Sequence, residues 1–102
     1  MWILQTTERS EAGPFTFRLM PGAIKTIGRS TTADFIVDAG MVSRFHCRLT
    51  ATRDEQVEIQ DLESTNGTFV NDRRVQRGVV APGDRVRVGR VEMIVKRGQE
   101  IS

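Results

Sequence analysis

Short runs of alternating apolar and polar residues restrict what this chain can fold into. The clearest runs are residues 15–19, 57–60 and 86–88. Side chains that alternate in this way point to opposite faces of an extended backbone, so each run predicts a half-buried β-strand. No window of about a dozen residues has the 3.6-residue apolar period of an amphipathic helix. The pattern therefore predicts an all-β fold.

Turn signals separate these runs from further strand candidates. The further candidates are residues 2–4, 24–27, 35–37, 47–51, 68–70 and 91–95. The turn signals are pairs of glycine, proline, asparagine or aspartate at 13–14, 21–22, 66–67, 71–72 and 82–83. Glycine and asparagine tolerate a left-handed backbone and proline fixes φ, so each pair can reverse the chain. Many short strands joined by tight turns predict an antiparallel sandwich or barrel.

Length and composition limit the organisation of the chain. Its 102 residues fit a single modest core, so we expect one domain over residues 1–102. No apolar run approaches the ~20 residues of a membrane span, and the N-terminus lacks the pattern of a signal peptide. The single cysteine, Cys47, cannot form a disulfide within the chain. We therefore expect a cytoplasmic, reducing location and no membrane association.

Arginine strongly outnumbers lysine, with 13 Arg and two Lys in a chain of formal charge +2. Two explanations stay open: the base composition of a GC-rich genome, or the use of guanidinium groups for bidentate capture of phosphate or carboxylate. The formal charge is −2 over residues 1–70 and +4 over residues 71–102. Arg85 and Arg87 in the basic part share one strand face, which is most simply a solvated outer face.

The chain offers no recognisable catalytic constellation. A hydrolytic triad would have to pair His46 with Ser43 or with Cys47. Ser43 is three residues from His46, whereas a nucleophile needs its base across the active site and an orienting acid behind that base. Cys47 is the neighbour of His46, and neighbours in a strand point to opposite faces. One histidine and one cysteine cannot make a structural zinc site, and no phosphate-cradling glycine-rich loop is present. We therefore expect no enzyme activity, no metal and no cofactor.

Nucleic acid is not an expected ligand, although the net charge is positive. Proteins that read single strands stack bases on aromatic side chains. This chain has only Trp2 and five phenylalanines, most of them at strand-like positions that suit a core. No recognition helix is visible either.

Three polar segments can together hold an anion. Residues 28–29 follow a strand candidate, residues 43–44 precede one, and residues 65–67 open another. If these segments gather at one end of a sandwich, they offer a guanidinium, hydroxyls, an amide and free backbone N–H groups. All of these donate hydrogen bonds, and phosphate oxygens only accept them. Each segment alone is a common surface or turn feature, so the combination carries the signal.

The order of these segments resembles that of a known family. The blocks are IGRS at 27–30, DFIVD at 34–38, VSRFH at 42–46 and DLESTNGTFVN at 61–71. In this order they resemble the forkhead-associated (FHA) domain, with a motif core at residues 27–71 and flanking strands over nearly the whole chain. The resemblance implies a β-sandwich of two twisted antiparallel sheets, about eleven short strands and recognition loops at one end. It also implies non-catalytic recognition of phosphothreonine peptides in signalling or regulated assembly.

The resemblance assigns five residues to the bound phosphopeptide. Arg29 would contact the phosphate directly, and the hydroxyl of Ser43 would donate to a phosphate oxygen. Arg44 occupies a variable position that often adds another phosphate contact. Thr65 would reach the phosphate or line the niche for the threonine methyl group. Asn66 would hold the peptide backbone through its amide.

Further positions are structural in the family. Gly28 and Gly67 would permit tight turns, and the ring of His46 would brace the loop that bears Ser43. We expect Asn71 to stabilise its own turn as part of the support of the site. Asp72 stands where glycine is frequent in the family, which predicts another turn type there.

Specificity and the mode of binding have their own expectations. Met41 lies near the position that selects the residue three places after the phosphothreonine, and its apolar side chain predicts an aliphatic residue there. The competing hypothesis is a phosphate-independent scaffold or dimerisation module that uses the sheet faces. Nucleic-acid binding through the basic C-terminal third is a third hypothesis, separable by its salt dependence.

Overall fold

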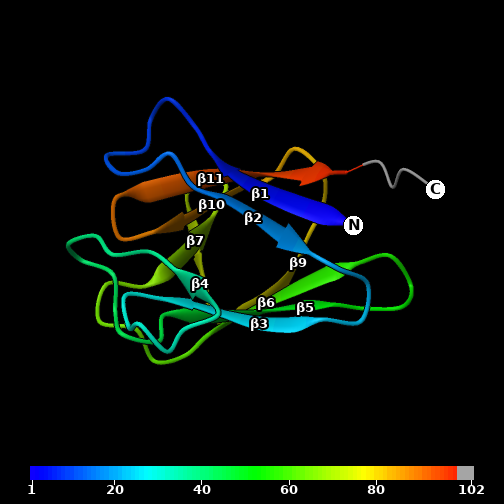
Figure 1. Cartoon of the computed structure of the whole chain (residues 1–102), viewed down its shortest axis with the longest axis horizontal. Helices are drawn as coiled ribbons and strands as arrows, with labels where there is room; N and C mark the ends of the chain where they lie inside the picture. The colour runs from blue at the N-terminus through cyan, green and yellow to red at the C-terminus, as the bar shows by residue number, and fades with distance from the viewer. Residues whose placement is uncertain (99–102) are drawn as a thin grey trace.

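Two β-sheets packed face to face make up the protein in the computed structural model, which describes residues 1–98 (Figure 1). Eleven strands and no helix occur within these residues. The prediction of an all-β sandwich is therefore confirmed. No helix within residues 1–98 is long and apolar enough to cross a membrane.

One sheet has six strands in the order β2-β1-β11-β10-β7-β8. Their bounds are Trp2–Thr6 for β1, Thr16–Leu19 for β2, Thr68–Val70 for β7, Arg73–Val75 for β8, Arg85–Val88 for β10 and Val91–Arg97 for β11. Each neighbouring pair is antiparallel. Beyond the pairing of β1 with β11, the backbone N–H of Gly98 donates to the carbonyl of Met1 at 2.9 Å. The first and last described residues therefore lie together.

The other sheet has five strands in the order β4-β3-β5-β6-β9. Their bounds are Ile24–Gly28 for β3, Phe35–Ile36 for β4, Cys47–Ala51 for β5, Val57–Asp61 for β6 and Arg77–Val80 for β9. The pair β3–β4 is parallel and the other pairs are antiparallel. This sheet is mixed because the loop at 29–34 doubles back, so that β4 starts beside the end of β3.

The core lies between the sheets and consists of the inward-facing side chains of each strand. In β5, Cys47, Leu49 and Ala51 are buried, whereas Arg48 and Thr50 lie on the outer face. Burial of apolar surface stabilises a fold by about 25 cal/mol per Å². The apolar side chains that face inward at alternate positions therefore provide the main stabilisation of the sandwich.

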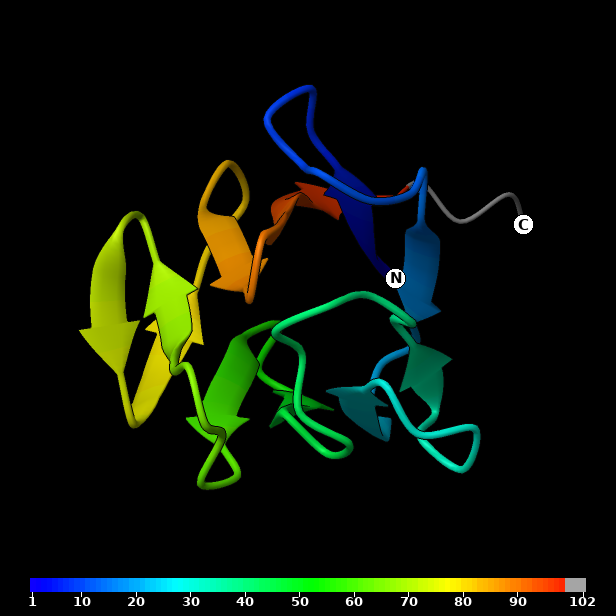
Figure 2. The same ribbon diagram turned by 90° about the vertical axis from the view of Figure 1, so that its left-hand side faces the viewer.

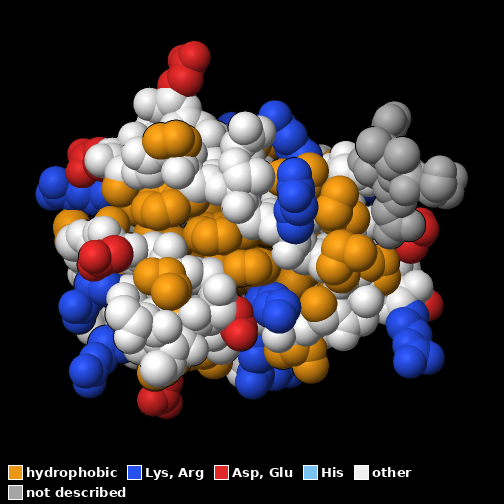
Figure 3. Space-filling view, viewed as in Figure 1, with side chains coloured by type: hydrophobic (Ala, Val, Ile, Leu, Met, Phe, Trp, Pro, Cys, Tyr) orange, Lys and Arg blue, Asp and Glu red, His pale blue; other side chains and the backbone are white. Residues whose placement is uncertain are grey.

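An aromatic stack closes one side of the sandwich between β2 and β4. The ring centroids of Phe15 and Phe17 lie 5.9 Å apart, and those of Phe17 and Phe35 lie 4.7 Å apart. Figure 3 shows a band of hydrophobic side chains along this side of the molecule. The stack joins strands that belong to different sheets and share no ladder.

Strand register brings three loops to one end of the sandwich. Cys47 at the start of β5 pairs with Ile27 near the end of β3 and with Asp61 at the end of β6. The segments 29–34, 37–46 and 62–67, called the recognition loops below, therefore leave the sheet at the same edge. Figure 2 looks onto this end of the molecule.

The β7–β8 turn differs from the expectation. Asn71 and Asp72 both have positive φ, 50° and 67°, which is the hallmark of the type I′ turn that Asn-Gly forms in two-residue hairpins. The prediction of another turn type is wrong, because aspartate also tolerates the left-handed conformation. The Asn71 amide accepts from the N–H of Arg85 at 3.0 Å and donates to Asp84 at 3.1 Å. Asn71 thus braces its turn against β10, at the end of β7 away from the recognition loops, and does not support the candidate site.

Candidate functional site

A depression of about 450 Å³ lies between the recognition loops. Its lining residues are Arg29, Gly40, Met41, Val42, Ser43, Thr65 and Asn66. Five residues singled out from the sequence are therefore brought to one place, and no carboxylate lines the depression. Such a surface suits a ligand that accepts hydrogen bonds and carries negative charge.

Gly28 determines how closely two recognition loops approach. A Cβ atom at this position would overlap the carbonyl oxygen of Arg44, so only glycine fits. Beyond the strand ladder, the N–H of Arg29 donates to the carbonyl of Ser43 at 3.0 Å, and that of Ser30 donates to Arg44 at 3.1 Å. The close approach therefore places Arg29 beside Ser43.

The guanidinium of Arg29 is oriented by its own neighbourhood. Its Nε–H donates to the carbonyl of Val42 at 3.2 Å. Within residues 1–98 no carboxylate pairs with it, and the side chain is exposed. The two terminal nitrogens, with four N–H donors and a full positive charge, are left for a ligand.

Ser43 and Thr65 join two loops at the rim of the depression. The backbone N–H of Thr65 donates to Ser43 Oγ at 3.0 Å. Because Ser43 Oγ accepts this bond, its own hydroxyl proton remains free to be donated to a ligand. The side chain of Thr65 is exposed beside it.

Asn66 reaches across the depression to Met41. Asn66 Nδ2 donates to the carbonyl of Met41 at 3.0 Å. Met41 has a φ of 69°, in the left-handed region, and this turns its carbonyl toward the amide. One N–H and the Oδ1 acceptor of Asn66 stay available, which is the pair of groups that an extended peptide backbone needs.

The ring of His46 connects two recognition loops from beneath. The backbone N–H of Ser43 donates to His46 Nδ1 at 3.1 Å, and His46 Nε2 lies 2.8 Å from the carbonyl of Gly67. Since Nδ1 accepts, the proton of the neutral ring belongs on Nε2 and is donated to Gly67. Burial lowers the pKa of His46, partly offset by the Gly67 bond and the charge of Asp61. The ring is therefore neutral at pH 7.

Asp61 organises the third loop, and sequence reasoning missed it. Its buried carboxylate accepts from the Ser64 N–H at 3.1 Å, the Ser64 hydroxyl at 2.5 Å and the Thr68 hydroxyl at 2.7 Å. Ser64 Oγ in turn accepts from the N–H of Gly67 at 3.0 Å. Burial alone would raise the pKa of Asp61, but these hydrogen bonds lower it. An aspartate three residues before a serine at a strand end is the signal that points to such a loop.

The FHA domain family model matches residues 25–89. The chain belongs to the FHA family. The resemblance inferred from the sequence is thereby confirmed, and this FHA domain can be set beside relatives.

Several proteins are similar to it in sequence. A segment of the ABC transporter ATP-binding/permease protein Rv1747 of Mycobacterium tuberculosis is 37% identical over 86 residues, covering 84% of this chain and 10% of that protein. The glycogen accumulation regulator GarA of the same organism is 34% identical, covering 78% of this chain and 49% of GarA. The chain therefore spans half or less of the length of these relatives.

Solved FHA structures share the fold. One, from work on phosphothreonine-dependent FHA domain interactions, has a TM-score of 0.83 at 33% identity and covers 97% of this chain and 98% of its own. The FHA domain of FhaA, complexed with the intracellular domain of Rv3910, has a TM-score of 0.82 at 35% identity and covers 94% of this chain and 100% of its own.

One predicted ligand residue of this FHA domain lies outside the depression. Arg44 follows Ser43 directly, but its exposed side chain does not line the depression and has no partner within residues 1–98. Gly67, by contrast, is part of the site's frame. Its φ of 90° requires glycine, and the side chain of Arg74 packs against it.

Proposed function

We propose that this FHA domain binds phosphothreonine peptides without catalysis, as a module for signalling or regulated assembly. The observation that carries the proposal is the set of unpaired donors around one depression, above all the guanidinium of Arg29. GarA is a glycogen accumulation regulator, and one solved relative comes from work on phosphothreonine-dependent FHA domain interactions. Another, the FHA domain of FhaA, is complexed with the intracellular domain of Rv3910. These relatives support the same class of ligand for this chain.

The phosphate provides the affinity. It carries about −1.5 to −2 charges at pH 7 and three acceptor oxygens. The terminal nitrogens of Arg29 and the hydroxyl of Ser43 supply donors, and hydrogen bonds to charged groups contribute about 1.5–3 kcal/mol each. An unphosphorylated threonine makes none of these bonds, so discrimination between the two peptides is large.

The peptide backbone and the threonine methyl group provide the rest of the binding affinity. The free N–H and Oδ1 of Asn66 suit the backbone next to the phosphorylated residue. Thr65 lines the depression, which supports a contact with the phosphate or with the methyl group. Burial of one methyl group is worth only about 0.8 kcal/mol. A strong preference for threonine over serine therefore also needs a contribution from backbone conformation.

We also propose that the domain has no catalytic role and acts in the cytoplasm, with residues 1–102 as one binding unit. Burial raises the pKa of the Cys47 thiol to about 12, so it is no nucleophile at pH 7. Both ring nitrogens of His46 are occupied by backbone groups, which leaves no free base. The cysteine is buried and unpaired, which suits a reducing compartment.

Calorimetry with a phosphothreonine peptide tests the proposal through Arg29→Ala. Loss of two or more charge-assisted bonds should weaken binding at least about 100-fold, beyond ready detection. Arg18→Ala is the matched control, because Arg18 is also exposed, lies on β2, and its side chain has no partner in the described range. Ser43→Ala should weaken binding less. Unchanged affinity in Arg29→Ala, with the fold intact by circular dichroism, would refute the assignment.

The position of Met41 predicts which residue the bound peptide carries three places after the phosphothreonine. Its side chain is 47% exposed and lies between the depression and a second hollow of about 280 Å³. That hollow is lined by Glu11, Ala12, Asp38, Ala39, Gly40, Met41, Arg90 and Val91. The apolar members favour an aliphatic residue three places after the phosphothreonine. Arg90 is paired with Glu11 at 3.3 Å, so the carboxylate of Asp38, unpaired within residues 1–98, leaves the lining negative and disfavours aspartate. A degenerate phosphopeptide library should select leucine, isoleucine or valine there, whereas selection of aspartate would contradict the assignment.

The phosphate-independent scaffold is the second candidate. It is favoured by two large apolar side chains on the outer face of the five-stranded sheet, Ile24 at 60% and Val79 at 55% exposure. Capture of a partner from lysate before and after phosphatase treatment separates the two candidates. Retention after phosphatase supports the scaffold, and loss supports phosphopeptide binding.

A further inference from the structure

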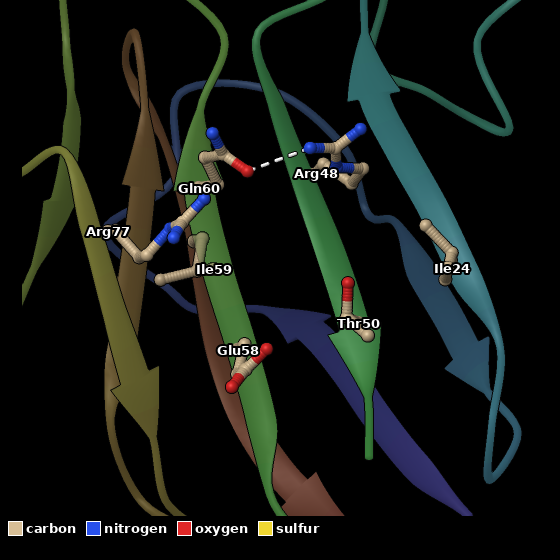
Figure 4. Close-up of a pocket in the computed structure, with 7 residues that line it drawn as sticks. All are labelled: Ile24, Arg48, Thr50, Glu58, Ile59, Gln60 and Arg77. Carbon is tan, nitrogen blue, oxygen red and sulfur yellow. Dashed lines mark hydrogen bonds between the residues drawn. The ribbon is translucent and has the colours of Figure 1, made fainter.

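The outward-facing side chains of β3, β5, β6 and β9 form two rows across the five-stranded sheet. Strand register places Thr26, Arg48, Gln60 and Arg77 in one, called the basic row. It places Ile24, Thr50, Glu58 and Val79 in the other, called the mixed row. A hollow of about 290 Å³ lies over both rows (Figure 4). The two rows thus share one concave surface.

Neither arginine of the basic row forms an ion pair within residues 1–98, and the carboxylate of Asp34 accepts from Thr26 at the β3 end of the row. Arg48 donates from Nη2 to Gln60 Oε1 at 2.8 Å, which uses one of its five N–H donors. Arg77 is exposed and has no partner within residues 1–98. Figure 4 shows Gln60 between these two arginines. An anionic group can therefore meet two guanidiniums on one short stretch of sheet.

Several other arginines of the basic C-terminal third are already engaged. Arg87 stacks on Phe69, with its Cζ atom 4.1 Å from the ring centroid. Arg85 pairs with Asp72 at 3.4 Å. The shared face of Arg85 and Arg87 that stands out in the sequence is thus partly occupied. Within the described residues, Arg48 and Arg77 are without an ion pair on the other sheet and line one hollow, whereas the unpaired Arg73 lies on the edge strand β8.

The basic row is the one nearer the recognition loops. Arg48 lies two residues after His46, and Gln60 directly precedes Asp61 at the end of β6. Strands rise about 3.3 Å per residue, so the basic row lies one or two residues below the loop end of the sheet. A protein segment that leaves the depression can therefore continue onto this face.

We propose that this outer face is a second docking site, for an acidic segment of the same phosphorylated partner. A carboxylate of that segment is held by Arg48, with the positive charge of Arg77 two strands away, and the apolar side chain two residues further on packs on Ile24 of the strand beside Arg48. The two rows are two residues apart along each strand, about 6.6 Å, which is also the spacing of residues i and i+2 of an extended peptide. The matching pattern is an acidic residue, any residue, then an apolar one. The partner's identity rests on the proposed function, whereas the docking chemistry does not.

The mixed row favours a peptide over a nucleic acid. The carboxylate of Glu58 lines the same hollow and has no ion-pair partner in the described range. A polyphosphate backbone would bring continuous negative charge against Glu58 and would leave Ile24 and Val79 without contact. A peptide with separate acidic and apolar residues can keep its charge away from Glu58 and place apolar side chains on Ile24 and Val79.

The test uses ¹⁵N-labelled protein saturated with a phosphothreonine peptide, titrated with an unphosphorylated peptide of two Glu-Ser-Leu repeats. Amide shifts should appear on β3, β5, β6 and β9, with the phosphopeptide still bound. The double variant R48Q/R77Q should weaken this second binding about tenfold or more and leave the phosphopeptide affinity within twofold. R18Q is the control on the other sheet, and a Gln-Ser-Leu peptide is the uncharged control ligand.

Three results would overturn the proposal. One is absence of shifts on the five-stranded sheet, and another is equal binding of the Gln-Ser-Leu peptide. The third is tighter binding of a twelve-residue oligothymidylate on the same face, lost in R48Q/R77Q, which would assign the face to nucleic acid. Titration of the acidic peptide into R29A separates the two hypotheses. Retained binding there upholds the docking face even if the phosphopeptide proposal fails.

Discussion

His46 joins two recognition loops through one ring, and it can do so only while the ring is neutral. Protonation at Nδ1 would set an N–H against the backbone N–H of Ser43, where an acceptor is needed. Protonation of His46 is therefore less favourable in the folded protein than in the unfolded chain. This difference is a contribution to stability that depends on pH.

The pH dependence has a definite sign. Because the folded-state pKa of His46 is lowered below 6.5, its contribution is fully present above pH 6.5. It decreases as the pH falls from there toward the folded-state value, since only the unfolded chain takes up the proton. Urea denaturation of wild type and His46→Gln between pH 5 and 8 measures it. The chain has one histidine, so the variant should lose the slope in this window, and equal slopes would contradict the prediction.

Single residues also show how far the sequence predicts the site. Arg29, Ser43, Thr65 and Asn66 follow from donor chemistry and the order of the motifs, and the structure gathers them. Arg44 does not join them, because the chain bends at Arg44 and Phe45 and the Arg44 side chain is not among those that line the depression. Sequence adjacency to Ser43 therefore does not place Arg44 in the depression.

At the scale of elements, the loop 62–67 depends on one buried carboxylate. Asp61→Ala would leave two hydroxyls and one N–H without their acceptor, at a cost of about 2–4 kcal/mol in the free energy of unfolding. The loop that carries Thr65 and Asn66 should then lose its shape. We expect roughly tenfold weaker phosphopeptide binding as well.

Chemical denaturation and calorimetry measure these two effects. Asp61→Asn keeps one acceptor and should lie between wild type and Asp61→Ala. Asp54→Ala, at an exposed position in the β5–β6 turn, is the control and should change neither quantity. A stability loss in Asp61→Ala no larger than in the control would show that the network does not stabilise the loop.

Strands could be predicted where one face is apolar and buried, and not where that contrast is weak. The runs at 57–60, 68–70 and 86–88 correspond to β6, β7 and β10. β8 and β9 lie at sheet edges and are rich in arginine, so no alternation marks them. Their pairing comes from register with β7 and β6, which is a property of the assembled sheets.

At the scale of the whole molecule, ligand binding should stabilise the sandwich. The depression is built from loops that connect five strands, β3 to β7, which belong to both sheets. A ligand that binds only the folded state therefore raises the free energy of unfolding of the whole domain. At a ligand concentration of 100 Kd the gain is about 2.7 kcal/mol. For a domain of this size that corresponds to a rise in Tm of roughly 10 °C or more.

Differential scanning fluorimetry measures this rise. The unphosphorylated peptide, and the phosphopeptide with Arg29→Ala, should leave Tm unchanged. An equal rise with both peptides would mean that the phosphate is not recognised.

The pairing of β1 with β11 has a consequence for how such a domain is used. Trp2 lies opposite Arg97, while the β10–β11 turn at Gly89 packs against Met41 at the other end. A longer polypeptide can thus enter and leave the sandwich at a single point remote from the recognition loops. The domain can be inserted into a longer protein, or circularly permuted, without a change to the recognition loops. In Rv1747 and GarA the matching segment is 10% and 49% of the protein, so segments similar to this domain occur in proteins of very different size.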